Sequence, residues 1–399
     1  MAAVAAAFGY VEHLFHRHRF TLLWLGFLVA AGVLLYRALV WDSTSYALQD
    51  ILINNADGMV RRGIGGEAVR ALQGLFGGSF RFWAFALLSA VACGLFGASL
   101  RLYRRLPDDP MYLPLILAPW GLLFYAYDPD GSFRKEVVGY LAIALILQGA
   151  LAARVLAMWI WAFAGVAVFL GALFVHEANL FLWPTLVMAL WLVGRAWPKA
   201  GAALLGIALL AGAAGTAVVW YLINLPQPDP AVICAAVAQQ PCSGPFEWLN
   251  AGLDAGIAYV AQRRDWDEAV YYAVLAVLGM VPFFAVRLPW GGWRLTALAV
   301  AIPFVAVLPL FLIAYDWGRW IQMALFPLSL VFVTAVALGL ANYRRLLPPW
   351  LAVPYIASLS MPHAGGSIRL EAAYILGALV ALVAAEWVFA RIAGVLRAR

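Results

Sequence analysis

The chain has 399 residues, of which 65% are hydrophobic and 12% are charged, and its mean hydropathy is +0.89. A soluble domain carries about 25% charged residues, so this composition excludes an ordinary soluble globular protein. The 26 basic and 20 acidic residues give a net charge of +6, a surplus that by itself would also suit a nucleic-acid partner.

Apolar runs of bilayer-spanning length recur along the chain. A run of about 17 to 25 mostly apolar residues crosses a membrane as a helix. Such runs, separated by charged residues or by Pro and Gly, fall at 20–40, 82–100, 111–127, 137–153, 155–175, 178–194, 202–224, 269–286, 295–314, 320–341 and 372–394. A weaker run at 347–361 is interrupted by prolines, and we count it as a short or broken span. The sequence therefore predicts an all-α polytopic membrane protein with about 11–12 transmembrane helices, forming a single transmembrane domain over residues 1–399.

The charges between these runs indicate the topology. When the spans are threaded in alternation from a cytoplasmic N-terminus, most basic residues fall on the inner side and most acidic residues on the outer side. This is the positive-inside bias of membrane proteins. The surplus positive charge is thus a topology signal, and we expect no nucleic-acid partner. We expect a multi-pass protein of the bacterial inner membrane with both termini in the cytoplasm.

Two outer loops are long, the first at 41–81 and the second at 225–268. Apolar residues recur at helical steps in both: Val69, Leu72, Leu75 and Phe76 in the first, and Leu249, Leu253, Ile257 and Val260 in the second. These patterns predict helices that lie on the outer membrane surface. The second loop also contains Cys234 and Cys242, and an oxidising outer face favours a disulfide between them over two free thiols.

Ionisable residues gather at the outer ends of the spans. Charge is costly near lipid, so such residues need partners or a function. In chain order the groups contain Asp42, Asp50, Asp57, Arg61 and Arg62; Asp128, Asp130, Arg134, Lys135 and Glu136; His176 and Glu177; Asp316 and Arg319; and His363, Arg369 and Glu371. The inner loops offer only scattered Arg and Lys, which membrane anchoring explains. We therefore expect the outer groups to converge in one site.

The first group combines arginine with glycine. Asp57-Gly58 alone indicates a turn, but a turn does not require Arg61 and Arg62 followed by three glycines within four positions. Glycine permits the close approach of a backbone, and paired guanidinium groups suit a bidentate grip on phosphate. This pattern favours a phosphate-binding role for the two arginines.

The second and fourth groups have structural alternatives that stay open. The sequence Asp128-Pro129-Asp130-Gly131 is an ordinary turn signal, and Arg134 with Lys135 also suits solvated charges at a helix start. Asp316 and Arg319 are three residues apart, so a local ion pair on one helix face explains them as well.

His176-Glu177 resembles half of a zinc motif, but no second histidine follows four residues on. The sequence therefore assigns no cofactor, and a divalent metal bound at this position stays an alternative. The sequence also lacks a Gly-x-Ser-x-Gly motif, a P-loop and a dinucleotide fingerprint. No inner loop is long enough to hold a domain for soluble nucleotide sugars.

This arrangement resembles the GT-C superfamily of membrane glycosyltransferases, which have many spans and a long first outer loop with surface helices. Members carry an essential acid in that loop and take their sugar from a polyprenyl phosphate. The family often shows two adjacent acids there, whereas this chain has single acids at Asp42, Asp50 and Asp57. The chain is also similar to the polysaccharide polymerases and EpsG-like proteins of bacterial envelopes in its size and outer arginines.

The resemblance implies transfer of a sugar from a polyprenyl-phosphate-linked donor to a glycan, lipid or protein acceptor at the outer face, among membrane lipids. We predict Asp57 as the base that deprotonates the acceptor, with Asp42 as the competing carboxylate. The predicted phosphate contacts are Arg61, Arg62, Arg134, Lys135 and Arg319. The predicted sugar contacts are His176 and Glu177, and Asp128, Asp130, Asp316, His363 and Arg369 complete the predicted substrate site.

Other functions stay open at this stage. A polysaccharide polymerase would use diphosphate-linked donors, and a transporter or flippase would move a lipid-linked glycan without chemistry. Transport commonly uses charged groups near the membrane middle, and the nearest candidates here, Arg37 and Glu386, both lie near span ends. A non-catalytic assembly subunit is the third alternative.

Overall fold

Helices account for nearly all of the regular structure. The computed structural model describes residues 2–39, 46–118, 120–238, 242–263, 266–288, 292–344 and 355–356. Eight helical segments of this part are long and apolar enough to cross a membrane. Their main helices are α1 (Ala2–Leu39), α4 (Phe80–Tyr103), α9 (Val155–Val175), α10 (Trp183–Ala196), α11 (Gly201–Ile223), α14 (Trp266–Phe284), α15 (Gly292–Ile313) and α16 (Trp317–Ala337). The helical, polytopic character that the composition predicts is therefore present.

One predicted span is not a continuous helix. Residues 111–127 instead form short pieces: η1 (Pro110–Tyr112), α5 (Leu113–Ile116) and α6 (Phe124–Tyr127), with α7 (Pro129–Ser132) next along the chain. Each of η1, α5 and α7 carries a proline in its first turn, where proline starts a helix but cannot continue one. The side chains of Leu115 and Trp120 are fully buried. Irregular backbone at membrane depth is tolerated when protein encloses it in this way.

The helix after this broken segment is also shorter than a full span. α8 (Glu136–Ala150) has 15 residues, which rise about 22 Å, less than the roughly 30 Å of a bilayer core. The predicted final span at 372–394 lies outside the described residues, as does the weaker one at 347–361 except for residues 355–356.

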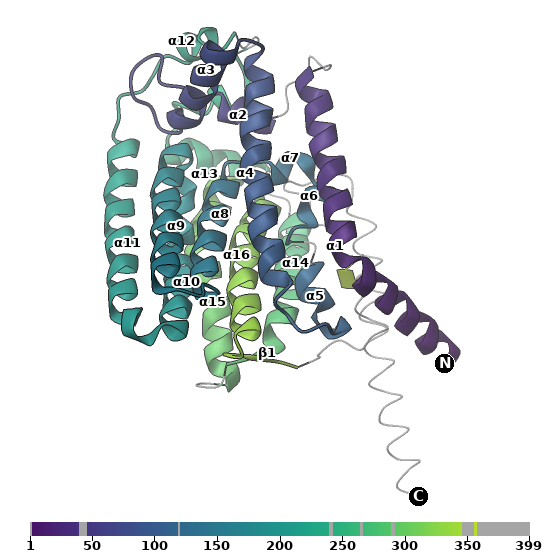
Figure 1. The fold of residues 1–399 in the computed structure, drawn as a ribbon. Helices are drawn as coiled ribbons and strands as arrows, with labels where there is room; N and C mark the ends of the chain where they lie inside the picture. The colour runs from purple at the N-terminus through teal and green to yellow at the C-terminus, as the bar shows by residue number, and fades with distance from the viewer. Residues whose placement is uncertain are drawn as a thin grey trace, which may run out of the picture.

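Helices α8 and α16 form the centre of the bundle. In the most apolar stretch of α16, 94% of the residues are buried. Helix α8 packs against α4, α9, α10 and α16 (Figure 1). The contact between α8 and α9 is close because Gly165 has no side chain: a Cβ there would lie 2.6 Å from the carbonyl oxygen of Ala142. Small residues allow this approach between membrane helices. The first residue of α8, Glu136, is buried.

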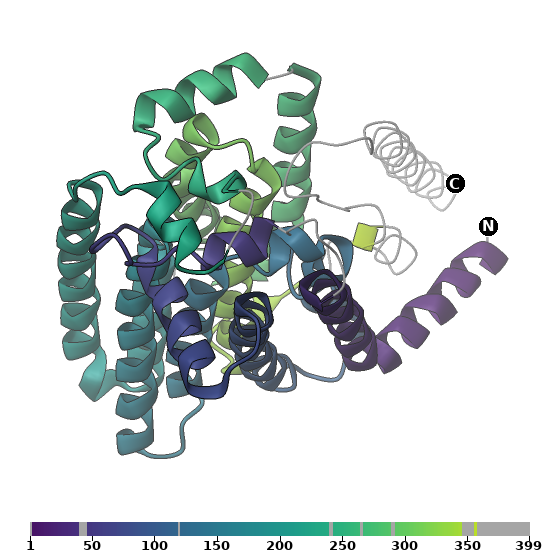
Figure 2. The same cartoon turned by 90° about the horizontal axis from the view of Figure 1, so that it is seen from above.

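Short elements from the two predicted outer loops cover one end of the bundle, here termed the capped end. They are α2 (Tyr46–Ile51) and α3 (Gly63–Phe76) from the first loop, and α12 (Pro230–Ala235), η4 (Gly244–Phe246) and α13 (Leu253–Arg263) from the second. Figures 1 and 2 show α2, α3 and α12 lying across this end. Helices α3 and α13 occur where the apolar spacing predicts surface helices, although Leu249 precedes α13. The capped end corresponds to the outer side in the predicted topology.

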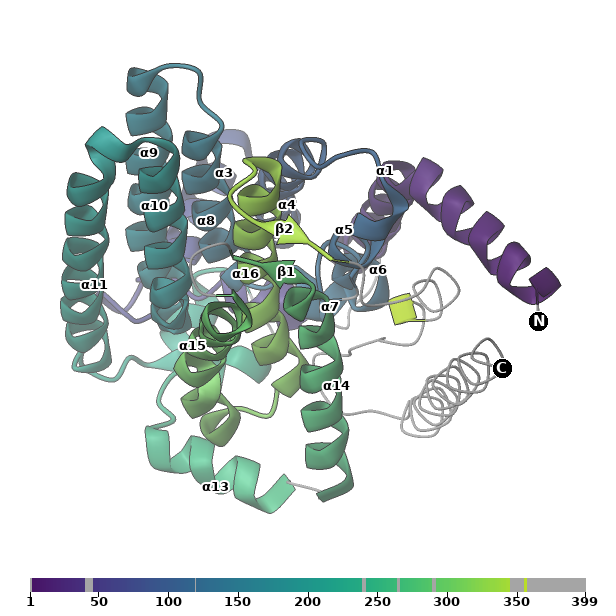
Figure 3. The same cartoon turned by 90° about the horizontal axis from the view of Figure 1, so that it is seen from below.

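The opposite end has simpler connections. A two-stranded antiparallel ladder pairs β1 (Val286–Arg287) with β2 (Asn342–Tyr343), with Val286 opposite Tyr343. The short turn η3 (Pro198–Ala200) joins α10 to α11. Figure 3 shows this end of the bundle, with β1 and β2 beside α16.

Candidate functional site

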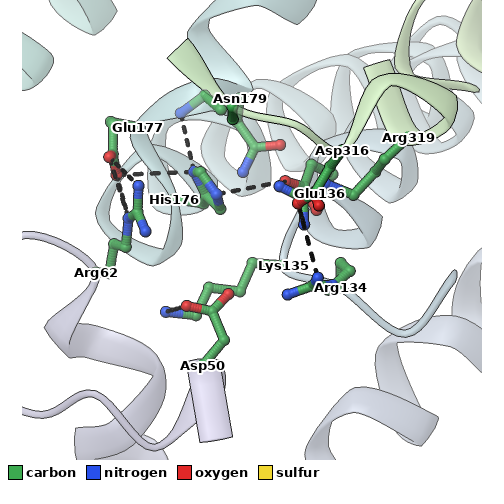
Figure 4. A network of polar contacts seen from close by, with 12 residues as sticks. Asp50, Arg62, Arg134, Lys135, Glu136, His176, Glu177, Asn179, Asp316 and Arg319 are labelled. Atoms are coloured by element: carbon green, nitrogen blue, oxygen red, sulfur yellow. Dashed lines mark hydrogen bonds and ion pairs between the residues drawn. The ribbon is translucent and has the colours of Figure 1, made fainter. Parts of the chain in front are cut away.

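A buried cluster of charged side chains lies at the capped end, where five segments far apart in the sequence meet (Figure 4). We term it the ion cluster, and its members are Asp50, Arg62, Arg134, Lys135, Glu136, His176, Glu177, Asp316 and Arg319. The segments are α2, the turn before α3, the start of α8, the turn η2 (Glu177–Leu182) with the residue before it, and the start of α16. The predicted convergence of separate hairpin ends is thus observed for part of the predicted set.

Asp50 and Lys135 form one pair of the cluster. The Lys135 Nζ lies 3.3 Å from an Asp50 carboxylate oxygen, and both residues are almost fully buried. Burial alone would raise the pKa of Asp50, but the Lys135 ammonium and the Arg62 guanidinium outweigh it and lower this pKa to about 2. Burial, together with Arg62, lowers the pKa of Lys135 to about 8. The Asp50 carboxylate therefore stays ionised, whereas Lys135 releases its proton more readily than an ordinary lysine does.

Arg62 and Glu177 form the second pair. Arg62 Nε donates to both carboxylate oxygens of Glu177, at 2.9 and 3.1 Å, and Arg62 Nη2 also donates to one of them. Burial opposes the charge of Arg62, but the Glu177 carboxylate outweighs it, so the pKa of Arg62 lies above its usual value. Bidentate pairs of this kind are the strongest ion pairs in proteins.

His176, in the turn between α9 and α10, lies beside the carboxylates of both Glu136 and Glu177. Its Nδ1 accepts a hydrogen bond of 3.1 Å from the backbone N–H of Ala178, so the neutral ring carries its proton on Nε2. Nε2 lies 3.4 Å from a carboxylate oxygen of Glu136. Burial, together with the nearby Arg62, lowers the pKa of His176 to about 4. The imidazole is therefore neutral at pH 7 and points its N–H at Glu136.

Arg134 and Arg319 both lie beside Asp316, and Arg319 also lies beside Glu136. The Nη1 of Arg319 lies 3.0 Å from Asp316, and its Nη2 lies 3.5 Å from Glu136. Arg134 Nη2 lies 3.7 Å from Asp316, and its guanidinium group stacks over the ring of Tyr46 at 4.2 Å. The local pair between Asp316 and Arg319 is present, and it forms part of the larger cluster.

Several nitrogen atoms of the cluster make no hydrogen bond within the described residues. They are Nε and Nη1 of Arg134, Nε of Arg319 and Nζ of Lys135, and neither carboxylate oxygen of Glu136 accepts one. Buried polar atoms in proteins are nearly always hydrogen-bonded, because an unpaired one costs about 1–3 kcal/mol. These donors come from three different positions and are 4%, 5% and 1% exposed respectively. The arrangement can therefore hold a small group rich in acceptor oxygens.

Arg61 and the glycines beside it serve a different contact from the one predicted. Arg61 Nη2 donates to the carbonyl oxygens of Trp248, Leu249 and Ala251, at 2.8, 2.9 and 3.1 Å. A Cβ at Gly66 would lie 2.2 Å from the carbonyl oxygen of Ile53, so this glycine admits the protein's own backbone. The glycine-rich segment is thus used for folding the first loop.

The acid predicted as the base lies outside the ion cluster. Asp57 is exposed, and its Oδ2 accepts a hydrogen bond of 2.7 Å from the backbone N–H of Asp229 in the second loop. Asp50, seven residues earlier in the same loop, is the acid that enters the cluster. Its signal in the sequence was the same as that of Asp57, a single acid in the first outer loop, so spacing alone did not distinguish them.

The remaining predicted residues are placed as follows. Asp128 caps α7, and its side chain accepts a hydrogen bond of 2.9 Å from the N–H of Gly131, which agrees with the turn alternative. Asp130 lies within α7. Asp42, His363 and Arg369 lie outside the described residues.

Glu136 was not among the predicted site residues, although it lies at the centre of the cluster. It is 1% exposed and faces both His176 and Arg319. An acid at the first residue of an otherwise apolar run was the available signal, because a carboxylate is favoured at a helix N-terminus. That signal does not show whether the carboxylate points to solvent or into the protein.

The predicted disulfide and the alternative of a divalent metal at His176 both concern the capped end. Cys234 and Cys242 are joined by a disulfide. Within the described ranges, no group of three or more His, Cys, Asp or Glu side chains is arranged to hold a metal ion. His176 instead uses its ring nitrogens for a backbone N–H and for Glu136.

Comparison with known proteins gives no relative: no family model, no curated protein and no solved structure matches the chain. The geometry of the cluster therefore carries the functional argument.

Proposed function

We propose that the protein is a membrane glycosyltransferase that moves a sugar from a polyprenyl-phosphate-linked donor to a glycan, lipid or protein acceptor. The observation that carries this proposal is the set of buried N–H groups on Arg134 and Arg319 that make no hydrogen bond within the described residues. A phosphate group offers the acceptor oxygens that such donors need, and arginine binds it through two parallel hydrogen bonds.

The charges in and around the cluster also favour an anion. Four cationic side chains of the ion cluster, namely Arg62, Arg134, Lys135 and Arg319, meet the four carboxylates of Asp50, Glu136, Glu177 and Asp316. His176 is neutral, so the charges of the cluster itself balance. Arg61 lies at the rim, with its Nη1 4.0 Å from Glu177, and adds one positive charge there. Burial lowers the pKa of Lys135, and the nearby positive charge of Arg62 adds to this effect.

The proposed reaction needs no cofactor. The acceptor hydroxyl attacks the anomeric carbon of the donor sugar, and the bond from that carbon to the phosphate oxygen breaks. The polyprenyl phosphate leaves with the electron pair of the broken bond, and Arg134 and Arg319 stabilise its developing charge. A carboxylate takes the proton of the acceptor. We propose Asp50 for this role in place of Asp57, because Asp50 lies in the cluster, and Asp42 is the competing carboxylate.

The proposal also assigns an orientation. The capped end would face the exterior of a bacterial inner membrane, where lipid-linked sugars are used without soluble nucleotide donors. Arg62, Glu177 and His176 would form one wall of the site, and Arg134 with Arg319 the other.

Purified protein in lipid nanodiscs tests the function directly. Donors with a radiolabelled sugar on a polyprenyl monophosphate or diphosphate are incubated with a mixture of acceptors, and the products are separated from the lipid. Release of sugar from the lipid supports a transferase. Release only from the diphosphate supports the polymerase alternative. In sealed vesicles, movement of intact donor between leaflets without release supports a flippase and contradicts the proposal.

A further inference from the structure

The second outer loop is docked on the first one through backbone atoms. Besides the three carbonyl groups bound by Arg61, the Nδ2 of Asn54 donates to the carbonyl oxygen of Ile233 at 2.9 Å. The Asp57 carboxylate accepts from the N–H of Asp229 at 2.7 Å. We term residues 228–238 and 242–251 the brace. Because these contacts recognise backbone groups, they require the brace to keep one conformation.

Two links within the brace fix that conformation. The disulfide joins Cys234 to Cys242, and Asn250 Nδ2 donates to the carbonyl oxygen of Pro228 at 2.9 Å. The side chains of Ile233 and Phe246 are fully buried. The brace is therefore anchored by buried side chains in the core of the protein, and the disulfide closes a loop that would otherwise be free to open.

The docking site of the brace is directly adjacent in sequence to the ion cluster. Arg61 and Arg62 are neighbours: Arg61 donates to the brace and has its Nη1 4.0 Å from Glu177, whereas Arg62 donates to both oxygens of Glu177. The backbone of Arg62 has a φ of 69°, in the left-handed region. A residue other than glycine rarely adopts this conformation, and it persists only when its surroundings hold it. Here the brace holds the Arg61 side chain, and Glu177 holds the Arg62 side chain.

We propose that Arg61 is a positioning residue: by docking the disulfide-bonded brace, it keeps Arg62 on Glu177 and so fixes one wall of the ion cluster. When Arg61 or the disulfide is removed, residue 62 relaxes toward ordinary backbone angles and its guanidinium group leaves Glu177. The effect reaches His176, because this ring lies 3.7 Å from Glu177. The part of the inference that concerns ligand binding rests on the proposed function.

Hydrogen exchange on the full chain in nanodiscs tests the coupling without any ligand. The variants are Arg61→Gln, the double variant Cys234→Ser/Cys242→Ser, and their combination. The reporting amides are Ala178 and Asn179, which bond to the side chain and the carbonyl of His176. Each variant should speed their exchange about tenfold, and the combination should do no more than either, since both act through one docked state.

Two controls separate positioning from general loosening. Arg61→Lys should restore most of the protection, because an ammonium group also donates to carbonyl oxygens. Arg70→Gln removes an arginine from the exposed pair with Glu67 on α3 and should leave the two amides unchanged. If a variant fails to fold, reduction of the disulfide in the folded wild type replaces it. Unchanged exchange at Ala178 and Asn179 after the brace has loosened would overturn the proposal.

Binding provides the second readout. If the cluster takes polyprenyl phosphate, Arg61→Gln should raise its Kd about tenfold while the protein still unfolds cooperatively. If the wild type does not bind this lipid, the proposed function fails but the exchange result stands. Normal binding in Arg61→Gln together with faster exchange would show that Arg62 does not contact the ligand, and would overturn the functional half of the inference.

Discussion

Two sets of arginines lie at the capped end, and they differ in what their nitrogen atoms contact. In the turn before α3, Arg61 is bound to three carbonyl oxygens and Arg62 to both oxygens of Glu177. At the starts of α8 and α16, Arg134 and Arg319 retain nitrogens without a hydrogen bond among the described residues. The hydrogen bonds of the first set are with protein oxygens, whereas the second set has buried donors that no described residue satisfies. Buried donor atoms without a hydrogen-bond partner therefore mark the site better than the density of arginine and glycine in the sequence.

The largest expected effect concerns the two acids of the first loop. Asp50→Asn should reduce sugar transfer by about 10²–10⁴-fold, the usual loss when a general base is removed. Asp57→Asn should keep transfer within about threefold, because an asparagine oxygen can still accept from the N–H of Asp229. Initial rates with a radiolabelled lipid donor compare the two variants.

Folding must be controlled in this comparison, because Asp50→Asn leaves the buried Lys135 without its carboxylate. Removing one partner of a buried pair costs about 3–5 kcal/mol of stability. The double variant Asp50→Asn/Lys135→Met removes both charges and should recover the unfolding midpoint but not transfer. Transfer at the wild-type rate in this double variant would contradict the role of Asp50 and favour Asp42.

The next effect is a loss of stability in mild acid. His176 has a pKa of about 4 in the folded protein and 6.5 in the unfolded chain. The unfolded chain therefore binds the proton more readily, so stability is full above pH 6.5 and falls as the pH is lowered toward 4. The loss is about 3 kcal/mol, since one pKa unit corresponds to 1.36 kcal/mol. Unfolding midpoints measured between pH 7.5 and 4.5 follow it.

The variant His176→Asn isolates the contribution of the imidazole. An asparagine can accept from the backbone N–H of Ala178 as an N-cap, but it does not titrate. Its unfolding midpoint should fall less between pH 6.5 and 4.5 than that of the wild type. An equal fall in both proteins would show that other groups of the cluster carry the pH dependence.

A smaller effect tests the structural role of the glycines in α3. Gly66→Ala should destabilise the protein by about 1–3 kcal/mol, because its Cβ would meet the carbonyl oxygen of Ile53 at 2.2 Å. Gly74→Ala in the same helix has open space around the new Cβ and should stabilise it by about 0.5–1 kcal/mol. Thermal unfolding of the two variants provides the comparison. Equal midpoints would mean that Gly66 does not admit the backbone of the first loop.

The sequence predicted the broad architecture because it depends on composition. Long apolar runs predicted the spanning helices, and apolar spacing predicted α3 and α13 on the first and second loops. The same method failed for 111–127, where prolines divide an apolar segment into short helices that other helices enclose. Hydropathy does not distinguish a residue that faces lipid from one that faces protein.

The site was predicted in its location but not in its details. Charged residues at hairpin ends indicated which side of the bundle to examine, and Arg134, His176 and Arg319 do meet there. The choice between Asp50 and Asp57 depended on how α2 is oriented, because α2 carries Asp50 and places it beside Lys135. The partners of Arg61 depended on how a second loop, almost two hundred residues away, folds over the first. Neither of these contacts is encoded in local spacing.

Binding of a polyprenyl monophosphate without sugar to the protein in nanodiscs tests the central claim most directly. Wild-type protein should bind it, and Arg134→Gln should weaken binding about tenfold or more, the loss expected for hydrogen bonds to a charged group. Arg70→Gln, which changes an exposed arginine of α3, should bind as the wild type does. Equal affinity in the wild type and Arg134→Gln would contradict the assignment of the ion cluster as a phosphate site.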